Sequence, residues 1–250
     1  MKIGTIILCR YSSSRLPGKI LRDIEGSPPL KYQYEKFARM NPADCVVIGT
    51  SEEASDDVIE AYCQEQGYHC FRGSLNNVAE RFLQAARAYG FDYVVRINAD
   101  GLFIDPETYQ DMLAICRTGQ YDFITNIKER TFPVGVTVEI VRTDFYESIQ
   151  RAIQASAAYR EHVTLYLYDH PEVGKQYDHV NTKCPDFRGL KIALDEPKDL
   201  ELAQRIMAKL KSDYYTCSLQ QLQGVVESVK QEFEQEGKAW NYIYPPPSNT

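Results

Sequence analysis

Three cationic side chains follow a largely apolar run at the start of the chain. Residues 3–9 carry no charge, and Arg10, Arg15 and Lys19 come next, with hydroxyl side chains and a Pro-Gly turn between them. Clustered cations, hydroxyls and turn backbone are the groups that hold a polyphosphate. The spacing matches neither the Walker A loop, Gly-x-x-x-x-Gly-Lys-Ser/Thr, nor the dinucleotide motif, Gly-x-Gly-x-x-Gly. Composition alone therefore leaves a polyphosphate site and a solvated basic loop equally open.

Two aspartates stand directly after short apolar segments. Asp100 follows residues 93–97, and Asp195 follows residues 191–194. Magnesium takes oxygen ligands and usually only one or two carboxylates from the protein, and its other ligands are often phosphate oxygens of a bound substrate. The pair is therefore a candidate metal site. For Asp195 the alternative is that it caps the following helix, and the local pattern alone favours capping.

Apolar segments alternate with helical patterns and must position these residues. We expect strands at residues 3–9, 45–50, 69–71, 93–97, 121–125 and 191–194, with an extended run at 133–141. We expect helices at about residues 57–66, 78–89, 144–155, 200–210 and 218–235, and a further helix that starts at residues 105–107. This alternation predicts an α/β fold with a mostly parallel sheet and helices on both faces. In such a sheet ligands bind at the carboxyl ends of the strands, where Arg10, Asp100 and Asp195 all fall.

Helix starts carry their own signals. Ser74 and Asn76 are expected to cap the helix that begins at residue 78, Asp105 the helix that begins at Pro106, and Ser218 the last helix.

The domain organisation is expected to be simple. The 250 residues can form one domain with one large core. The alternation breaks at about 130–185, which we expect to be an insertion with acceptor and dimer contacts. Residues 211–250 are expected to form a C-terminal helix and an extended tail that includes 244–248.

Composition narrows the class of protein. The net charge of −7 argues against a protein that grips nucleic acid, so the basic loop suits a small anionic ligand better. Seven cysteines without a Cys-x-x-Cys pair indicate reduced, mostly buried thiols. The chain shows neither a signal peptide nor a membrane-spanning segment. We therefore expect a cytoplasmic protein.

The order of residues around the basic loop adds a resemblance. Arg10-x-x-Ser13-x-Arg15-Leu16-Pro17-Gly18-Lys19, followed by Gly26-x-Pro28-x-Leu30, resembles the opening signature of the sugar-activating cytidylyltransferases. Within them it is most similar to the SpsF-like branch of spore coat polysaccharide biosynthesis, related to the acylneuraminate and Kdo cytidylyltransferases. In that family the loop wraps the triphosphate of CTP.

Later motifs extend the resemblance to about residue 210. Residues 96–106 resemble the family's Arg-x-x-x-Asp-x-Pro-Leu-Ile-Asp-Pro, with Leu102 in place of the first proline, and residues 194–201 its closing Val-Asp-Glu/Thr-Pro-Glu-Asp-Leu-Glu. Weaker matches are Arg72-Gly73-Ser74 with Arg81, residues 133–139 with Thr137 in place of an aspartate, and Arg160-Glu161-His162-Val163-Thr164.

The resemblance implies a Rossmann-like three-layer α/β/α fold of the glycosyltransferase A type and a magnesium-dependent transfer of CMP from CTP to an acidic sugar. It implies catalytic roles for Arg10, Arg15, Lys19 and Asp100, and metal ligation by Asp100 and Asp195. The nucleotide-binding residues that it implies are Leu8, Cys9, Arg10, Ser13, Arg15, Gly18, Lys19, Arg72, Ser74, Arg81, Asn98 and Asp100. The acceptor-binding residues that it implies are Glu139, Arg160 and His162. For His162 a packing role is equally open.

Other functions stay open from the sequence. The acceptor could be a phosphorylated small molecule or a sugar 1-phosphate, and the chain could be a nucleotide-binding subunit without turnover. A retaining glycosyltransferase is disfavoured because Asn98-Ala99-Asp100 lacks the first carboxylate of an Asp-x-Asp motif. Neither nucleic acid nor a membrane is expected as a partner, and the resemblance favours a homodimer.

Overall fold

Seven strands form one sheet in a computed structural model that describes residues 1–13 and 15–242. The strands are β1 (Ile3–Leu8), β2 (Val46–Ser51), β3 (His69–Gly73), β4 (Tyr93–Asn98), β5 (Phe123–Thr125), β6 (Glu139–Arg142) and β7 (Gln176–Asp178). Their order is β3-β2-β1-β4-β6-β5-β7, and of these β6 alone runs antiparallel to its neighbours. The predicted mostly parallel sheet is confirmed. The expected tail at 244–248 lies outside the described residues.

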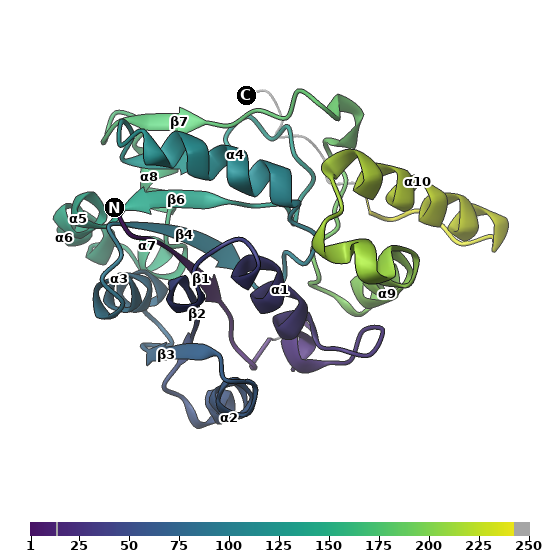
Figure 1. Ribbon diagram of the computed structural model, residues 1–250, viewed down its shortest axis with the longest axis horizontal. Coiled ribbons are helices and arrows are strands. Elements are labelled where there is room, and N and C mark those ends of the chain that lie inside the picture. The colour runs from purple at the N-terminus through teal and green to yellow at the C-terminus, as the bar shows by residue number, and fades with distance from the viewer. Residues whose placement is uncertain (14, 243–250) are drawn as a thin grey trace.

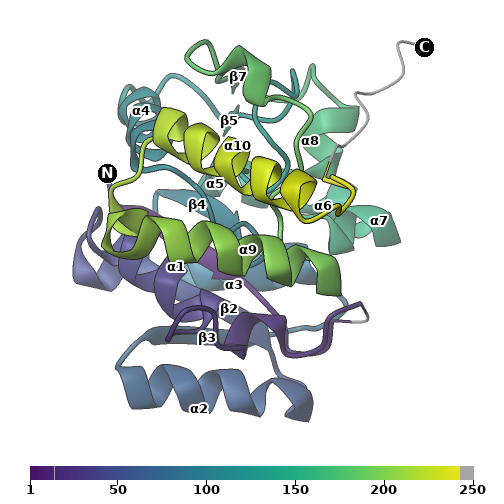
Figure 2. The same ribbon diagram turned by 90° about the vertical axis from the view of Figure 1, so that its right-hand side faces the viewer.

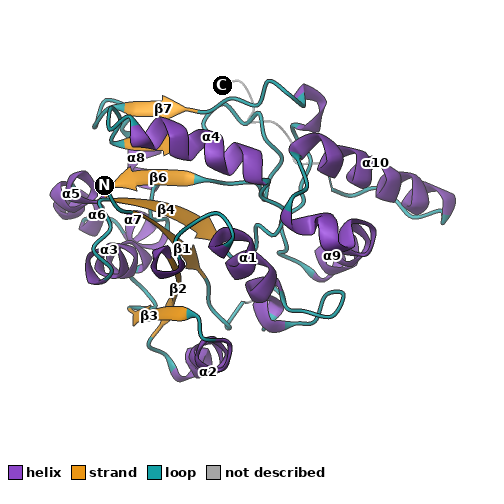
Figure 3. Cartoon of the chain, in the orientation of Figure 1, coloured by secondary structure: helices purple, strands orange, loops and turns teal. Residues whose placement is uncertain are grey.

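Helices cover both faces of this sheet, as Figures 1 and 2 show. The helices are α1 (Pro29–Ala38), α2 (Asp57–Gln66), α3 (Val78–Ala88), α4 (Pro106–Arg117), α5 (Thr143–Ser148), α6 (Gln150–Gln154), α7 (Ala157–Glu161), α8 (Leu165–Asp169), α9 (Pro197–Leu210) and α10 (Leu219–Gln235). Ile7 of β1 packs in the core beneath α1, α2, α4, α9 and α10, whereas Ile6 and Leu8 pack in a second core with α3, α5, α6 and α8. Alternate side chains of a strand point to opposite faces, so one apolar strand serves both cores. The architecture is the expected three-layer α/β/α sandwich (Figure 3).

The prediction of a strand at residues 191–194 is wrong. Lys191 forms an isolated bridge with Val134, and the chain then turns so that the Leu194 N–H donates to the Asp100 carbonyl oxygen at 2.9 Å. Ile192 and Leu194 are nevertheless buried. An apolar run shows that a segment is buried, but it does not show whether the backbone pairs in a sheet.

Two of the predicted helix caps are confirmed and one is wrong. The side chain of Asp105 accepts a hydrogen bond from the Thr108 N–H, and the Ser218 hydroxyl oxygen accepts from the Gln221 N–H. At α3 the N-cap is Asn77 rather than Asn76, and its side-chain oxygen accepts from the Glu80 N–H. Ser74 lies one step further out, where its hydroxyl oxygen accepts from the Asn77 N–H.

The polar ends of β1 and β4 lie side by side. β1 pairs in parallel with β4, and Leu8 is in register with Asn98. In the sheet, β2 lies on one side of β1 and β4 lies on the other side. The strand order therefore reverses at β1, and a ligand crevice opens at such a position in an α/β sheet. In the described part of the chain no helix is both long enough and apolar enough to cross a membrane.

Candidate active site

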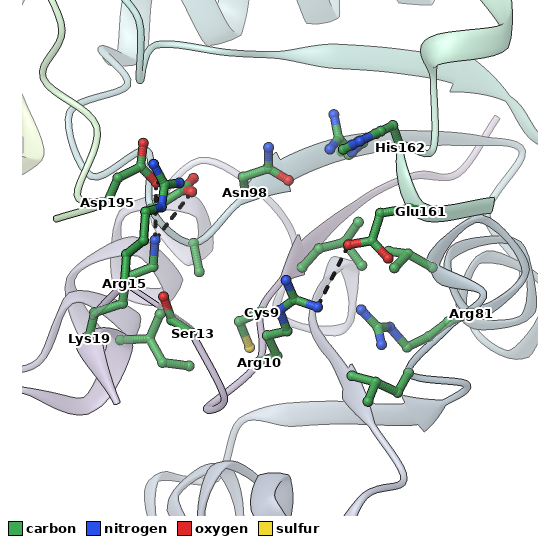
Figure 4. A pocket seen from close by; sticks show the side chains of 17 residues that line it. Cys9, Arg10, Ser13, Arg15, Lys19, Arg81, Asn98, Glu161, His162 and Asp195 are labelled. Carbon is green, nitrogen blue, oxygen red and sulfur yellow. Dashed lines mark hydrogen bonds and ion pairs between the residues drawn. The ribbon is translucent and has the colours of Figure 1, made fainter. Parts of the chain in front are cut away.

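A cavity of about 260 Å³ opens at the carboxyl ends of β1 and β4 (Figure 4). Most of the predicted site residues line it, although they come from segments far apart in the chain. They are Leu8, Cys9, Arg10, Ser13, Arg15, Lys19, Arg81, Asn98, Asp100, His162 and Asp195. The rule that ligands bind at the carboxyl edge of the sheet thus located the cavity correctly.

Lys19 joins the two aspartates at one end of the cavity. Its Nζ donates to Oδ2 of Asp100 at 3.4 Å, to Oδ1 of Asp195 at 3.3 Å and to the Leu194 carbonyl oxygen at 2.6 Å. Gly18, with φ of 67°, makes the turn that starts the short 3-10 helix Lys19–Leu21. The structure therefore brings together one cation and two carboxylates that are separated by up to 176 positions in the sequence.

The Asp195 carboxylate faces the cavity and does not cap the following helix. In α9 the N-cap is Glu196, and the capping box is completed by Asp199, whose Oδ2 also accepts from the Asp195 N–H at 2.9 Å. Asp195 instead contacts Lys19, Arg15 at 3.4 Å and Lys191 at 3.3 Å. The local pattern favoured capping, and the structure assigns that role to the neighbouring residues.

The pKa values of the two aspartates are shifted in opposite directions. Burial raises the pKa of Asp100, against the attraction of Lys19, and the neighbouring Asp195 raises it further. For Asp195 burial also acts to raise the pKa, but Lys19, Lys191 and Arg15 together hold that pKa below its usual value. The cationic groups at this end of the cavity therefore stabilise the charged form of Asp195 more strongly than that of Asp100.

The donor set of Asp100 and Asp195 fits a magnesium ion. Both carboxylates approach the same Nζ, so their oxygens converge on one small region. The described residues contain no cluster of three or more His, Cys, Asp or Glu side chains that could hold a metal by themselves. Two carboxylates suit magnesium, which takes its remaining ligands from water and substrate phosphate.

Close backbone contacts fix the loops that carry these aspartates. A Cβ atom at Gly101 would lie 2.6 Å from the Gly135 carbonyl oxygen, and one at Gly135 would lie 2.7 Å from the Ala193 nitrogen. Gly135 also has a φ angle of 110°, which residues other than glycine rarely adopt. The loop after β4, the segment before β6 and the segment before α9 are therefore packed backbone against backbone.

Arginines and Glu161 form the other end of the cavity. Arg10 points toward Glu161 in Figure 4, at 3.7 Å. Arg81 is buried and donates to the Ser74 carbonyl oxygen, and burial lowers its pKa. Arg96, from the middle of β4, also lines this end. The cavity therefore offers cationic groups at both ends, as a polyphosphate site requires.

Arg72, Ser74 and Gly18 do not line the cavity, although the resemblance implied that they contact the nucleotide. The Arg72 guanidinium is held by Asp57 and Glu60, each at 2.7 Å. Ser74 acts through its carbonyl oxygen, which holds Arg81, and Gly18 shapes the turn before Lys19. Ser74 and Gly18 thus act on residues that line the cavity, whereas Arg72 pairs with acidic residues outside it.

Glu139 and Arg160 are also engaged inside the protein. Glu139 is fully buried, where it pairs with Arg96 and accepts from the hydroxyls of Thr164, at 2.8 Å, and Tyr168. Arg160 donates to the Gln154 carbonyl oxygen. The implied acceptor contact of these two residues is therefore not seen, whereas His162 lines the cavity.

Sequence reasoning missed several residues of the site. Arg96 and Glu161 belong to motifs of the resemblance, but no role was predicted for either residue. Leu75 and Val78 add apolar lining at the start of α3. Asp56 was missed because it lies 45 positions from its partner: its carboxylate accepts from the Tyr11 N–H at 2.8 Å and so fixes the start of the basic loop.

The Cys9 thiol lines the cavity but is not a nucleophile. Burial raises its pKa well above the usual range, so the thiol stays protonated. All seven cysteines are free and six of them are buried, as the composition predicted.

Comparison with known proteins gives consistent matches. A family model described as "Cytidylyltransferase" matches residues 5–231. The spore coat polysaccharide biosynthesis protein SpsF of Bacillus subtilis is 33% identical over 172 residues, which cover 66% of this chain and 70% of SpsF. A 3-deoxy-manno-octulosonate cytidylyltransferase of Aeromonas salmonicida is 32% identical over 111 residues, 42% of each chain.

The fold has a solved counterpart of nearly the same length. The structure of a cytidylyltransferase from Leptospira borgpetersenii superimposes with a TM-score of 0.84 at 27% sequence identity. The superposition covers 97% of this chain and 99% of that one. The similarity therefore includes the strands, the loops of the cavity and the C-terminal helices.

Proposed function

This chain belongs to the cytidylyltransferase family and is a nucleotidyltransferase, and on that premise we propose that it transfers CMP from CTP to an acidic sugar with release of pyrophosphate. The observation that carries the proposal is the meeting of Lys19 with Asp100 and Asp195 at the end of a cavity that also holds Arg10 and Arg15. This arrangement supplies cations for phosphate and carboxylates for a metal at one place.

The reaction replaces one bond to the α-phosphorus by another. The oxygen of an acceptor hydroxyl forms a bond to the α-phosphorus and loses its proton to solvent, the bond to the bridging oxygen of the β-phosphate breaks, and pyrophosphate leaves with the electron pair. Lys19 and Arg15 neutralise the charge that grows on the leaving pyrophosphate. Asp100 and Asp195 would hold a magnesium ion, which when bound supplies charge stabilisation at the phosphate oxygens.

The other end of the cavity is assigned to nucleotide and acceptor recognition. Arg81 and the backbone around Leu8 and Cys9 line it behind the phosphates, and His162 reaches it from the segment after α7. The acidic acceptor is proposed from the sequence relatives, one of which is named for 3-deoxy-manno-octulosonate.

A second acceptor class is supported by one observation. Glu139 and Arg160, which the resemblance placed at the acceptor, are occupied by Arg96 and by Gln154. Of the three residues implied to contact the acceptor, His162 alone lines the cavity. A phosphorylated acceptor and a sugar 1-phosphate are therefore tested beside the acidic sugar in the same assay. The nucleotide chemistry is the same in both cases.

Thermal unfolding with nucleotides tests the proposal. CTP, UTP, ATP and GTP are each added with and without magnesium, and a ligand at about 100 times its dissociation constant adds roughly 2.7 kcal/mol of stability. We expect a shift that is selective for CTP and requires magnesium, followed by pyrophosphate release when an acidic sugar is added. Stabilisation by another base, or by none, would overturn the choice of CTP. Binding without pyrophosphate release from any acceptor class would indicate a nucleotide-binding subunit.

A further inference from the structure

The loop that carries Asp100 is held at every second carbonyl group. The Asn98 carbonyl oxygen accepts from Nε2 of Gln33 at 3.4 Å, and that of Asp100 accepts from the Leu194 N–H at 2.9 Å. The next two, at Leu102 and Ile104, accept from the Tyr214 hydroxyl at 2.8 Å and from Nζ of Lys36 at 3.0 Å. Three of the four donors are side chains from outside the loop.

Tyr214 is the donor that comes from the C-terminal part of the chain, beyond the last motif of the family resemblance. It lies in the 3-10 helix Lys211–Tyr215, between α9 and α10, and is fully buried. Its ring lies under Nζ of Lys36, 3.7 Å from the centroid, and meets the Tyr32 ring edge-on at 5.2 Å. The tyrosine is therefore locked against α1, and its hydroxyl is aimed at a loop 112 positions away.

We infer that Tyr214 is a positioning residue that fixes the Asp100 carboxylate for metal-dependent nucleotide binding; this inference rests on the proposed function. Leu102 is two residues from Asp100, and its buried carbonyl group loses its donor when the Tyr214 hydroxyl is removed. A buried carbonyl group without a donor favours states in which the loop opens to water. An opened loop no longer holds Asp100 opposite Asp195.

The adjacent Tyr215 provides a matched control. Its hydroxyl donates to Oε2 of Glu35 at 2.7 Å, and its ring stacks with Arg39 at 3.9 Å. Both partners belong to α1 or the residue that follows it, and neither belongs to the loop after β4. Tyr215→Phe therefore removes the same group from the next residue, but it leaves the loop's hydrogen bonds intact.

The test compares the full-length protein with Tyr214→Phe and Tyr215→Phe by two measurements. Hydrogen exchange reports protection of the amides at 100–104, and electron paramagnetic resonance of Mn²⁺ reports metal binding in the presence of CTP. For Tyr214→Phe we expect protection at 100–104 to fall about tenfold and the half-saturating Mn²⁺ concentration to rise about tenfold. For Tyr215→Phe we expect both within about twofold of the unaltered protein.

Two outcomes overturn the inference. Either Tyr214→Phe melts at a lower temperature with unchanged exchange at 100–104 and unchanged Mn²⁺ binding, or both variants change these quantities equally. If the unaltered protein binds no Mn²⁺ with CTP, the proposed function fails and exchange at 100–104 still reports whether Tyr214 holds the loop.

A measurement on the unaltered protein covers the case in which Tyr214→Phe does not fold. Amides at 100–104 and at 211–217 are followed by hydrogen exchange over a series of sub-denaturing urea concentrations. We expect the two segments to lose protection together, because one opening frees both. Independent loss, with 100–104 exchanging first, would overturn the inference.

Discussion

Two sets of ion pairs lie beside β4. They use similar residues but differ in how deeply the charged groups are buried and in how many hydrogen bonds those groups make. In the inner set, Arg96 pairs with Glu139, whose side chain is 1% exposed and also accepts from Thr164 and Tyr168. In the cavity set, Lys19 meets Asp100 and Asp195 at 3.3 to 3.4 Å, and the Asp100 side chain is 33% exposed.

The difference shows which charges a ligand can use. A buried pair with short, multiple hydrogen bonds is costly to open, because each partner would remain in the protein without its counter-charge. The longer contacts in the cavity set leave Lys19 able to turn to a phosphate group and the two carboxylates able to turn to a metal ion. We therefore regard the inner set as support for the fold and the cavity set as the chemical site.

Asp100→Asn should have the largest effect on activity. Removing one of the two carboxylates is expected to lower the turnover rate roughly a hundredfold or more, because charge stabilisation by the metal contributes several kcal/mol. Thermal stability should stay the same or rise, because burial already disfavours the ionised form of Asp100. Steady-state pyrophosphate release and a melting curve measure the two effects. Near-normal turnover would remove Asp100 from the metal site.

Glu139→Gln should have the largest effect on stability. It leaves Arg96 without its counter-charge and is expected to cost about 3 kcal/mol of the free energy of unfolding. Glu161→Gln is the matched control, because Glu161 is 41% exposed and pairs with Arg10 at 3.7 Å, so its loss should cost less than about 1 kcal/mol. Urea unfolding of both variants gives the comparison. Equal losses would show that the buried Arg96–Glu139 pair contributes no more to stability than the exposed Arg10–Glu161 pair.

Lys19→Ala should weaken triphosphate binding selectively. We expect the CTP dissociation constant to rise roughly 10- to 100-fold in the presence of magnesium, and that of CMP to change far less. Arg72→Ala is the control. It also removes one positive charge, but the Arg72 guanidinium is bound to Asp57 and Glu60 outside the cavity. Its CTP affinity should stay within about twofold of the unaltered protein. Equal loss of CTP and CMP binding in Lys19→Ala would contradict a contact to the outer phosphates.

Asp56 should give a smaller, pH-dependent effect. Burial acts to raise its pKa, but hydrogen bonds from Ser51, Thr50 and the Tyr11 N–H hold that pKa below its usual value. A lowered pKa in the folded state stabilises the protein above the unfolded pKa of about 4, and this contribution is lost as the pH falls through the folded value. Urea unfolding from pH 7 down to pH 3 should therefore show the stability difference between the unaltered protein and Asp56→Asn narrowing. A constant difference would contradict this role.

The parallel frame and most of the cavity could be predicted because their signals are local. Apolar runs predict β1 and β4, and the rule for carboxyl edges places Arg10 and Asp100 at the same edge of the sheet. Asp195 lies beside them although the segment before it is not a strand of the sheet. The partner that a charged side chain contacts could not be predicted in this way. Whether Arg72 faces a ligand or Asp57 and Glu60 depends on how α2 packs beside β3. The same holds for Glu139, whose partners come from β4 and from the segments around α8.

Other expectations stay predictions. They are the magnesium ion, the homodimer, the cytoplasmic location and the role of the insertion at 130–185 as an acceptor and dimer region. Residues 130–185 contribute β6 and β7 to the common sheet, so this segment is also part of the fold's frame.

The contact of Gly101, Gly135 and Ala193 bears on how such a protein can change over time. A side chain at Gly101 or Gly135 would push apart the loops that hold the two aspartates, so these positions offer no route to a new function. His162 and Glu161 lie at the other end of the cavity on short helices and turns, where side chains can be exchanged without moving that backbone. On the proposed function, a change of acceptor would then involve one end of the cavity and leave the backbone at the other end unchanged.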